Sequence, residues 1–156
     1  MAAPAAGIAF TLMRLFTIGF TQKSAEQFFS LLKDSHAKRV VDVRLHNVSQ
    51  LAGFSKRDDL RYFLRTVCNM DYMHLPVLAP TAAMLEEYKK GNGKWEQYER
   101  KFLSLMKSRT IENVVDRRVL SESCLLCSED KPDHCHRRLV AEYLQKHWGD
   151  IDIIHL

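Results

Sequence analysis

The run Val40-Val41-Asp42-Val43-Arg44 is β-branched and apolar except at Asp42 and Arg44. Continuous runs of this kind are typical of strands that are covered on both faces of a parallel sheet. An earlier apolar run, Arg14-Leu15-Phe16-Thr17-Ile18-Gly19-Phe20, has the same character. Between the two, Ser24 is a good N-cap for a helix that extends to His36. The order strand, helix, strand predicts a βαβ unit with a right-handed crossover.

The same alternation continues to the end of the chain. Further strands are expected at 72–77, 125–126 and 151–156, and further helices at 55–67, 81–90, 95–106 and 136–148. Ser55 and Asp133 are candidate N-caps for the second and last helices. Residues 111–123 are left open between strand, helix and loop. The pattern predicts an α/β fold: a single-domain three-layer sandwich with a mainly parallel sheet of about five strands and helices on both faces.

Size and composition agree with one ordinary globular domain. The chain has 156 residues, of which 46% are hydrophobic and 27% charged, with a formal net charge of +4. This mild basic bias permits an anionic small molecule or a nucleic acid as partner. We expect residues 1–13 to be a disordered leader and residues 14–156 to form the domain. No stretch approaches the roughly 18 apolar residues of a membrane span.

The cysteines point to a reducing environment. Four cysteines at uneven spacing, with Cys68 far from the others, do not resemble a secreted disulfide framework. We therefore expect free thiols in a cytoplasmic protein. No cofactor is expected, because Gly19 stands alone, without a G-x-G-x-x-G or P-loop pattern.

A polar cluster occupies the fourth predicted strand and the start of the last helix. Between Cys124 and Arg138, fifteen positions hold three of the four cysteines, two histidines and two arginines. A helix N-terminus presents unpaired N–H groups, so in α/β proteins such a junction is a common ligand site.

Five motifs now follow one another in order and spacing: Thr17-Ile18-Gly19, Asp42-Val43-Arg44, Tyr72-Met73-His74-Leu75-Pro76, Cys127-Ser128-Glu129 and Cys135-His136-Arg137. On these motifs the chain resembles the DUF488 family (domain of unknown function 488) from about residue 14 to the end. The resemblance fits Met13 as the usual beginning, but it implies little about function. Many members look like Thr-Ile-Gly-His-Ser at the first motif, whereas this chain has Phe20-Thr21, so no imidazole role carries over to Phe20.

Asp42 and Arg44 flank Val43 at a strand end, so their side chains share one face. Arg44 would bind an anion there, with Asp42 as its orienter or as a base. The alternative is a structural ion pair that closes the end of the sheet.

Cys127 and Cys135 are candidate reactive thiols. The helix dipole, together with Arg137 or a protonated histidine, would lower a thiol pKa at a helix start. This argument favours Cys135 somewhat over Cys127. The alternative is that both only fill the core, where free cysteine is common. A redox pair between the two stays open.

The remaining site assignments follow from position. Glu129 would act as an acid or base beside Cys127, or would hold Arg137; the alternative is a solvated loop carboxylate. His136 joins Asp42, Arg44, Cys127, Glu129 and Cys135 as a catalytic candidate. Arg44, Thr17, Gly19, His74 and Arg137 are the candidate substrate-binding residues.

Zinc is a competing use of the cluster, through Cys124, Cys127 and Cys135 with His134 or His136. Residues three apart in a strand point to opposite faces, so Cys124 and Cys127 would not converge. No metal site is predicted on this ground. Trp95 and Tyr98, one helical turn apart, are expected to pack in the core rather than to stack on bases.

Together these features predict an enzyme with a polar Cys/His/Arg/Asp site that acts on an anionic substrate, such as a nucleotide or nucleic acid. The alternative is a non-catalytic nucleic-acid-binding or interaction module whose Cys-His-Arg cluster is structural.

Overall fold

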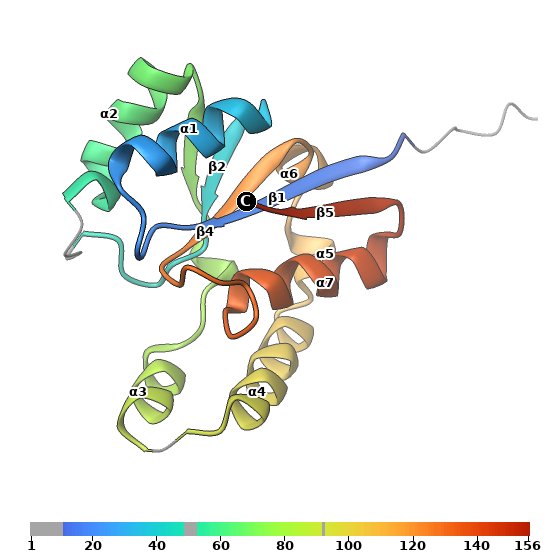
Figure 1. Cartoon of the computed structure of the whole chain (residues 1–156). Coiled ribbons are helices and arrows are strands. Elements are labelled where there is room, and N and C mark those ends of the chain that lie inside the picture. The colour runs from blue at the N-terminus through green and yellow to red at the C-terminus, as the bar shows by residue number, and fades with distance from the viewer. Residues whose placement is uncertain (1–10, 49–52, 92) are drawn as a thin grey trace, which may run out of the picture.

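The computed structural model describes residues 11–48, 53–91 and 93–156. Five strands form one all-parallel sheet in the order β3-β2-β4-β1-β5 (Figure 1). They are β1 (Met13–Gly19), β2 (Arg39–Asp42), β3 (Asp71–His74), β4 (Ser123–Cys127) and β5 (Ile151–His155). The predicted parallel α/β sheet is confirmed. The predicted leader falls largely on residues 1–10, outside the described residues, but Met13 is the buried first residue of β1.

The principal helices also match the prediction. They are α1 (Ala25–Ser35), α2 (Arg57–Cys68), α3 (Ala82–Lys90), α4 (Trp95–Ser108) and α7 (His136–Trp148), with 3₁₀ turns at Gly53–Ser55 and Pro76–Leu78. The open region after α4 forms two short helices, α5 (Ile111–Val114) and α6 (Arg117–Leu120). None of the helices in the described ranges has the length and apolar character that a bilayer crossing requires.

Helix capping agrees with the sequence at α1 only. Ser24 and Gln27 form a reciprocal capping box there. The N-cap of α2 is Lys56 rather than Ser55, because Ser55 belongs to the preceding 3₁₀ turn. The N-cap of α7 is Cys135 rather than Asp133, because the Cys135 N–H bonds to the Pro132 carbonyl and closes a turn first.

The sheet has a separate apolar core on each face, which makes the predicted three layers. On one face, α1 and α2 pack over side chains that include Phe16, Ile18, Val40, Cys124 and Leu126. On the other face, α4 and α7 pack over Leu15, Val41, Val43, Leu125 and Cys127. Successive side chains of each strand therefore pack in opposite cores, because neighbouring residues of a strand face opposite sides of the sheet.

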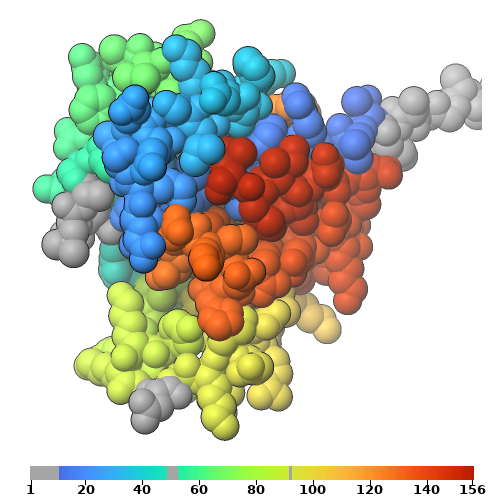
Figure 2. Space-filling model, viewed as in Figure 1, coloured from blue at the N-terminus to red at the C-terminus, as the bar shows by residue number. Residues whose placement is uncertain are grey.

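The chain leaves β2 and β4 in opposite directions. After β2 it crosses through α2 on one face, and after β4 it crosses through α7 on the other face. Since β2 and β4 are neighbours, their carboxyl ends mark the point in an open α/β sheet where ligands usually bind. The α3–α4 hairpin projects beyond this end as a lobe (Figure 2).

Candidate functional site

A cavity of about 510 Å³ lies at the carboxyl ends of β2 and β4. The two loops after these strands form part of its wall, and the α3–α4 hairpin forms much of the rest. Five predicted site residues line it: Arg44, Cys127, Glu129, Cys135 and His136. The other lining residues are Leu45, His46, Val48, Pro80, Leu85, Tyr88, Lys89, Trp95, Tyr98, Ser128 and His134.

Cys127 and His136 form a thiol–imidazole pair in this cavity. Cys127 ends β4, His136 begins α7, and Sγ lies 3.4 Å from Nδ1. The other ring nitrogen, Nε2, lies 2.8 Å from the carbonyl oxygen of Val43. A carbonyl only accepts, so Nε2 carries the proton and Nδ1 presents its lone pair to the thiol. Burial lowers the pKa of His136, which favours this neutral form.

The surroundings divide the two neighbouring thiols into a donor and an acceptor. A hydrogen bond from Cys135 lowers the pKa of Cys127, and the Arg137 charge and backbone N–H groups at Ser128 and Glu129 lower it further, against the effect of burial. The same hydrogen bond, together with burial, raises the pKa of Cys135. Of the two thiols, Cys127 therefore has the lower pKa, the opposite of the order that the sequence favoured, because Cys135 donates a hydrogen bond to Cys127.

Arg137 lies behind the cavity and holds the loop that surrounds Cys127. Its fully buried guanidinium donates to the carbonyls of Glu129 and Asp130, the latter at 3.0 Å. It also lies 3.4 Å from Cys135 Sγ and from Thr17 Oγ1. The predicted link between Glu129 and Arg137 therefore exists through the backbone carbonyl of Glu129.

Four of the five predicted substrate-binding residues, all but Arg44, do not line the cavity. Arg137 is one, and Thr17 is another, buried with its hydroxyl 2.6 Å from His155 Nδ1. The third is Gly19, which packs directly against the Glu129 backbone. The contacts of these three residues stabilise the loop after β4 rather than a ligand.

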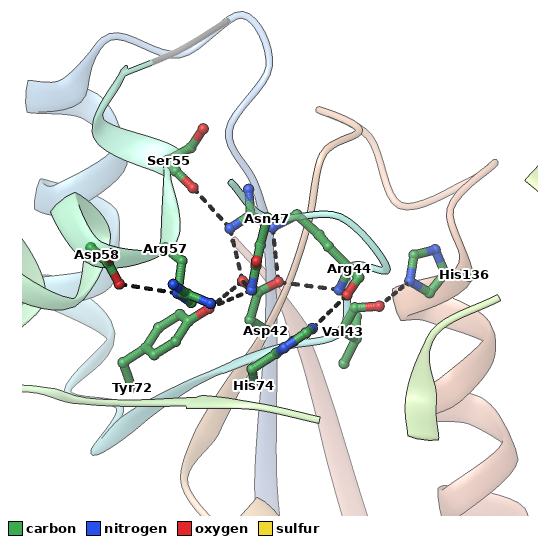
Figure 3. Close-up of polar contacts among 10 residues, drawn as sticks. All are labelled: Asp42, Val43, Arg44, Asn47, Ser55, Arg57, Asp58, Tyr72, His74 and His136. Carbon is green, nitrogen blue, oxygen red and sulfur yellow. Dashed lines mark hydrogen bonds and ion pairs between the residues drawn. The ribbon is translucent and has the colours of Figure 1, made fainter. Parts of the chain in front are cut away.

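Asp42 and Arg44 form a buried bidentate ion pair, with Nε–Oδ1 and Nη2–Oδ2 distances of 2.8 Å each (Figure 3). The Asp42 carboxylate also accepts from the Tyr72 hydroxyl at 2.5 Å and from the Asn47 amide at 3.4 Å. Burial and the Asp42 charge raise the pKa of Tyr72. This network corresponds to the structural ion pair that the sequence left as an alternative, and Asp42 does not line the cavity.

His74 belongs to the same network. Its Nε2 donates to the Arg44 carbonyl at 2.8 Å, so the imidazole fixes the start of the loop after β2 (Figure 3). His74 is absent from the cavity wall. Its position therefore supports a structural contact rather than the expected ligand contact.

Arg44 lines the cavity, and a nitrogen of its guanidinium, Nη1, is the one buried side-chain polar atom of the described residues that has no hydrogen-bond partner. The Phe20 ring lies 5.3 Å from the guanidinium carbon. The residue that replaces the family's histidine thus packs against Arg44 by a cation–π contact.

The other two cysteines are in ordinary core environments. Cys124 faces the α1–α2 core, on the opposite side of β4 from Cys127, and burial raises its pKa. Cys68 is half-buried, bonds to the Phe29 carbonyl at 3.6 Å, and has a pKa raised by burial. All four thiols are free. Cys68 and Cys124 therefore serve as internal controls for Cys127.

Aromatic side chains form a wall that the sequence did not predict. Trp95 stacks on His134 at 5.1 Å and on Tyr98 at 5.3 Å between ring centroids. Trp95 and Tyr98 do pack on the core, as expected, yet both also face the cavity. Their helical spacing indicated one apolar stripe but carried no sign of a cavity at its edge. His46 and Lys89 were also missed, since isolated basic residues in loops and helix ends carry no such signal.

Three ligand-type atoms converge at the bottom of the site. The Sγ atoms of Cys127 and Cys135 and a ring nitrogen of His136 all lie within 4.8 Å of one another. Cys124, which the zinc alternative required, points away. These three residues could hold a metal ion without Cys124, whose position was the reason that no metal site was predicted.

A protein-family model described as "Domain of unknown function DUF488" matches residues 24–144. The match covers most of the chain and includes Asp42-Val43-Arg44, Cys127-Ser128-Glu129 and Cys135-His136-Arg137. The chain therefore belongs to the DUF488 family, as the motifs predicted. Comparison with curated proteins and with solved structures gave no match.

Proposed function

We propose that this DUF488 protein is an enzyme that uses Cys127 as its nucleophile and His136 as its base on an anionic substrate. The observation that carries the proposal is the 3.4 Å contact between Cys127 Sγ and His136 Nδ1 at the cavity. The Val43 carbonyl orients the imidazole through Nε2. Nucleophile, base and orienting group are the three parts of an activated cysteine.

The chemistry that these groups support is group transfer through a covalent intermediate. The Cys127 proton passes to Nδ1 of His136, and Sγ bonds to an electrophilic carbon or phosphorus of the substrate. The bond to the leaving group breaks, and that group takes the proton from His136. Water then attacks the intermediate, releases the transferred group and restores the thiol.

The cavity wall supports an anionic substrate that carries a ring. Lys89, His46 and Arg44 line this wall and supply positive charge or N–H donors. Trp95 and Tyr98 supply flat aromatic surface for a base or a similar ring. A nucleotide or a nucleic-acid end combines both features. Free thiols of this kind persist in the reducing cytoplasm, where we place the protein.

The test is iodoacetamide labelling of the native protein at pH 7, with peptide mass spectrometry on each cysteine. We expect Cys127 to react well before Cys68 and Cys124. Phosphorylated compounds are then screened for a mass adduct, which Cys127→Ser should abolish and Cys124→Ser should retain. If Cys127 reacts only when the protein unfolds, the nucleophile proposal is wrong.

A second candidate is a non-catalytic module that binds nucleic acid. It is favoured by the buried contacts of Asp42, Arg44 and Arg137, which stabilise the fold around the cavity. This candidate predicts a salt-dependent affinity for single-stranded nucleic acid that Cys127→Ser leaves unchanged. The Cys127→Ser variant therefore distinguishes the two candidates: it loses the mass adduct if the protein is the enzyme, and it keeps the nucleic-acid affinity if the protein is the binding module.

A further inference from the structure

We infer that Cys127, Cys135 and His136 also bind one thiophilic divalent cation of the zinc type, with its fourth position open to the cavity. The binding itself is independent of the proposed enzyme. Its consequence for reactivity rests on that proposal, because a cation held by Cys127 would occupy the nucleophile.

The donor set suits such an ion. Zinc in proteins is held by cysteine sulfur and histidine nitrogen, and Cys₂His with one open position is a known catalytic set. His136 offers Nδ1 because Nε2 is hydrogen-bonded to the Val43 carbonyl. Hard cations such as Mg²⁺ prefer oxygen ligands and would find none in this set.

The distances fit a tetrahedral site after a small closing movement. With Zn–S about 2.3 Å and Zn–N about 2.0–2.1 Å, sulfur and nitrogen lie ~3.6 Å apart and two sulfurs ~3.8 Å apart. Cys127 Sγ and His136 Nδ1 are already 3.4 Å apart. The three ligand atoms all lie within 4.8 Å of one another, so one ion can reach every one.

Groups around the ligands are already arranged as in metal sites. Ligating histidines usually donate their second ring nitrogen to a carbonyl or carboxylate, as His136 does to Val43. The Arg137 guanidinium lies 3.4 Å from Cys135 Sγ and places a positive charge and an N–H donor beside this ligand atom. All three ligands are buried, so their geometry is held by packing.

Charge and proton balance are simple. The cation binds two thiolates and one neutral imidazole, and two thiol protons are released to solvent. The resulting centre has no net charge of its own, which suits a buried position. Because Cys127, Cys135 and His136 all line the cavity, the fourth position faces the space where a substrate would lie.

The bound cation would lower the nucleophilic reactivity of Cys127, because a thiolate that shares a lone pair with the metal is a weaker nucleophile. Zinc availability would then regulate the site, with reactivity restored when the ion is withdrawn.

Zn²⁺ and Co²⁺ are the probes, added to the full chain after reduction and removal of metal by a chelator. We expect one Zn²⁺ per chain by competition with a chromophoric chelator, and a thiolate-to-cobalt absorption band with Co²⁺. Cys127→Ser, Cys135→Ser and His136→Gln should each weaken affinity by more than about 100-fold, since even outer partners are worth about 10–100-fold. Cys124→Ser and His147→Gln are the matched controls and should bind as the parent does, because neither residue lines the cavity.

Cys135→Ser is the decisive variant, because it keeps Cys127 and leaves a residue of similar size. Unchanged affinity in this variant, or lost affinity in the folded Cys124→Ser protein, overturns the inference. Circular dichroism on each variant confirms that it is folded. Iodoacetamide labelling of Cys127 without metal tests the nucleophile separately, whereas protection of Cys127 by Zn²⁺ tests the regulation.

Discussion

A Cβ atom at Gly19 would lie 1.6 Å from the carbonyl oxygen of Glu129. The last residue of β1 therefore packs directly on the loop that follows Cys127, with no room for a side chain. Arg137 donates a hydrogen bond to the same carbonyl. The position of the loop beside the thiol is thus fixed by a glycine and an arginine that never touch the cavity.

Gly19→Ala should displace this loop. A contact of 1.6 Å with backbone cannot be relieved by a side-chain rotation, so we expect a loss of about 1–3 kcal/mol in unfolding free energy. Urea denaturation measures it. Gly53→Ala is the control, because a Cβ there meets nothing within 4 Å. Equal stability of the two variants would contradict the close approach.

Arg137→Lys should destabilise the protein although the charge is kept. Lysine cannot serve the carbonyls of Glu129 and Asp130 together, so we expect a loss of about 2–3 kcal/mol. Arg118→Lys changes a side chain that is 91% exposed and should be neutral. Thermal unfolding compares the two, and a neutral Arg137→Lys would show that one hydrogen bond is enough.

Asp42→Asn tests whether this carboxylate is structural. It leaves the buried Arg44 guanidinium without its counter-charge, at an expected cost of about 3–5 kcal/mol. Asp58→Asn removes the partner of Arg57 at a site where Asp58 is 80% exposed, so the change in unfolding free energy should be far smaller. Chemical denaturation of both variants gives the comparison, and similar small losses would argue against a structural Asp42.

His136→Gln should slow the labelling of Cys127. Glutamine cannot take the thiol proton, and a general base typically contributes about 10²–10⁴-fold to proton transfer. We expect at least a tenfold lower rate with iodoacetamide at pH 7. His147→Gln, on the same helix and stacked on Tyr143, is the matched control. A Cys127 rate that is equal in both variants would exclude His136 as the base.

Tyr143 makes stability sensitive to alkaline pH. Its hydroxyl donates to Glu112 at 2.8 Å and its ring stacks on His147, while burial and Glu112 raise its pKa to about 12. The unfolded side chain ionises near pH 10, so stability falls as pH rises from about 10 to 12. Tyr143→Phe should lose less stability between pH 9 and 11 in urea titrations. A parallel loss in both proteins would contradict the raised pKa.

The sequence predicted the elements well because their signals are local. Apolar runs, the Ser24 cap and the strand period placed the five strands and put Cys124 and Cys127 on opposite faces. The contact of Arg137 with Glu129 was among the expected alternatives, but its contact with Thr17 could not be predicted, since Thr17 lies on β1, 120 residues away. The cavity wall likewise depends on how the α3–α4 hairpin folds back on the sheet.

The short helices α5 and α6 show the limit of local patterns. Four residues each give too little periodicity to distinguish a helix from a strand or loop. Which of the two thiols has the lower pKa was not predicted for a related reason. It depends on the hydrogen bond that Cys135 donates to Cys127, and the spacing of the residues along the chain does not reveal that contact.

Because β4 lies between β1 and β2, the centre of the sheet is built from a segment near the end of the chain. During synthesis, β2 can pair with β3, but β1 has neither of its neighbours, β4 and β5, until residues 123–155 have left the ribosome. β1 and one edge of β2 therefore stay unpaired until β4 is made. Because the same strand carries Cys127, this thiol reaches its place beside His136 only when β4 has joined β1 to β2.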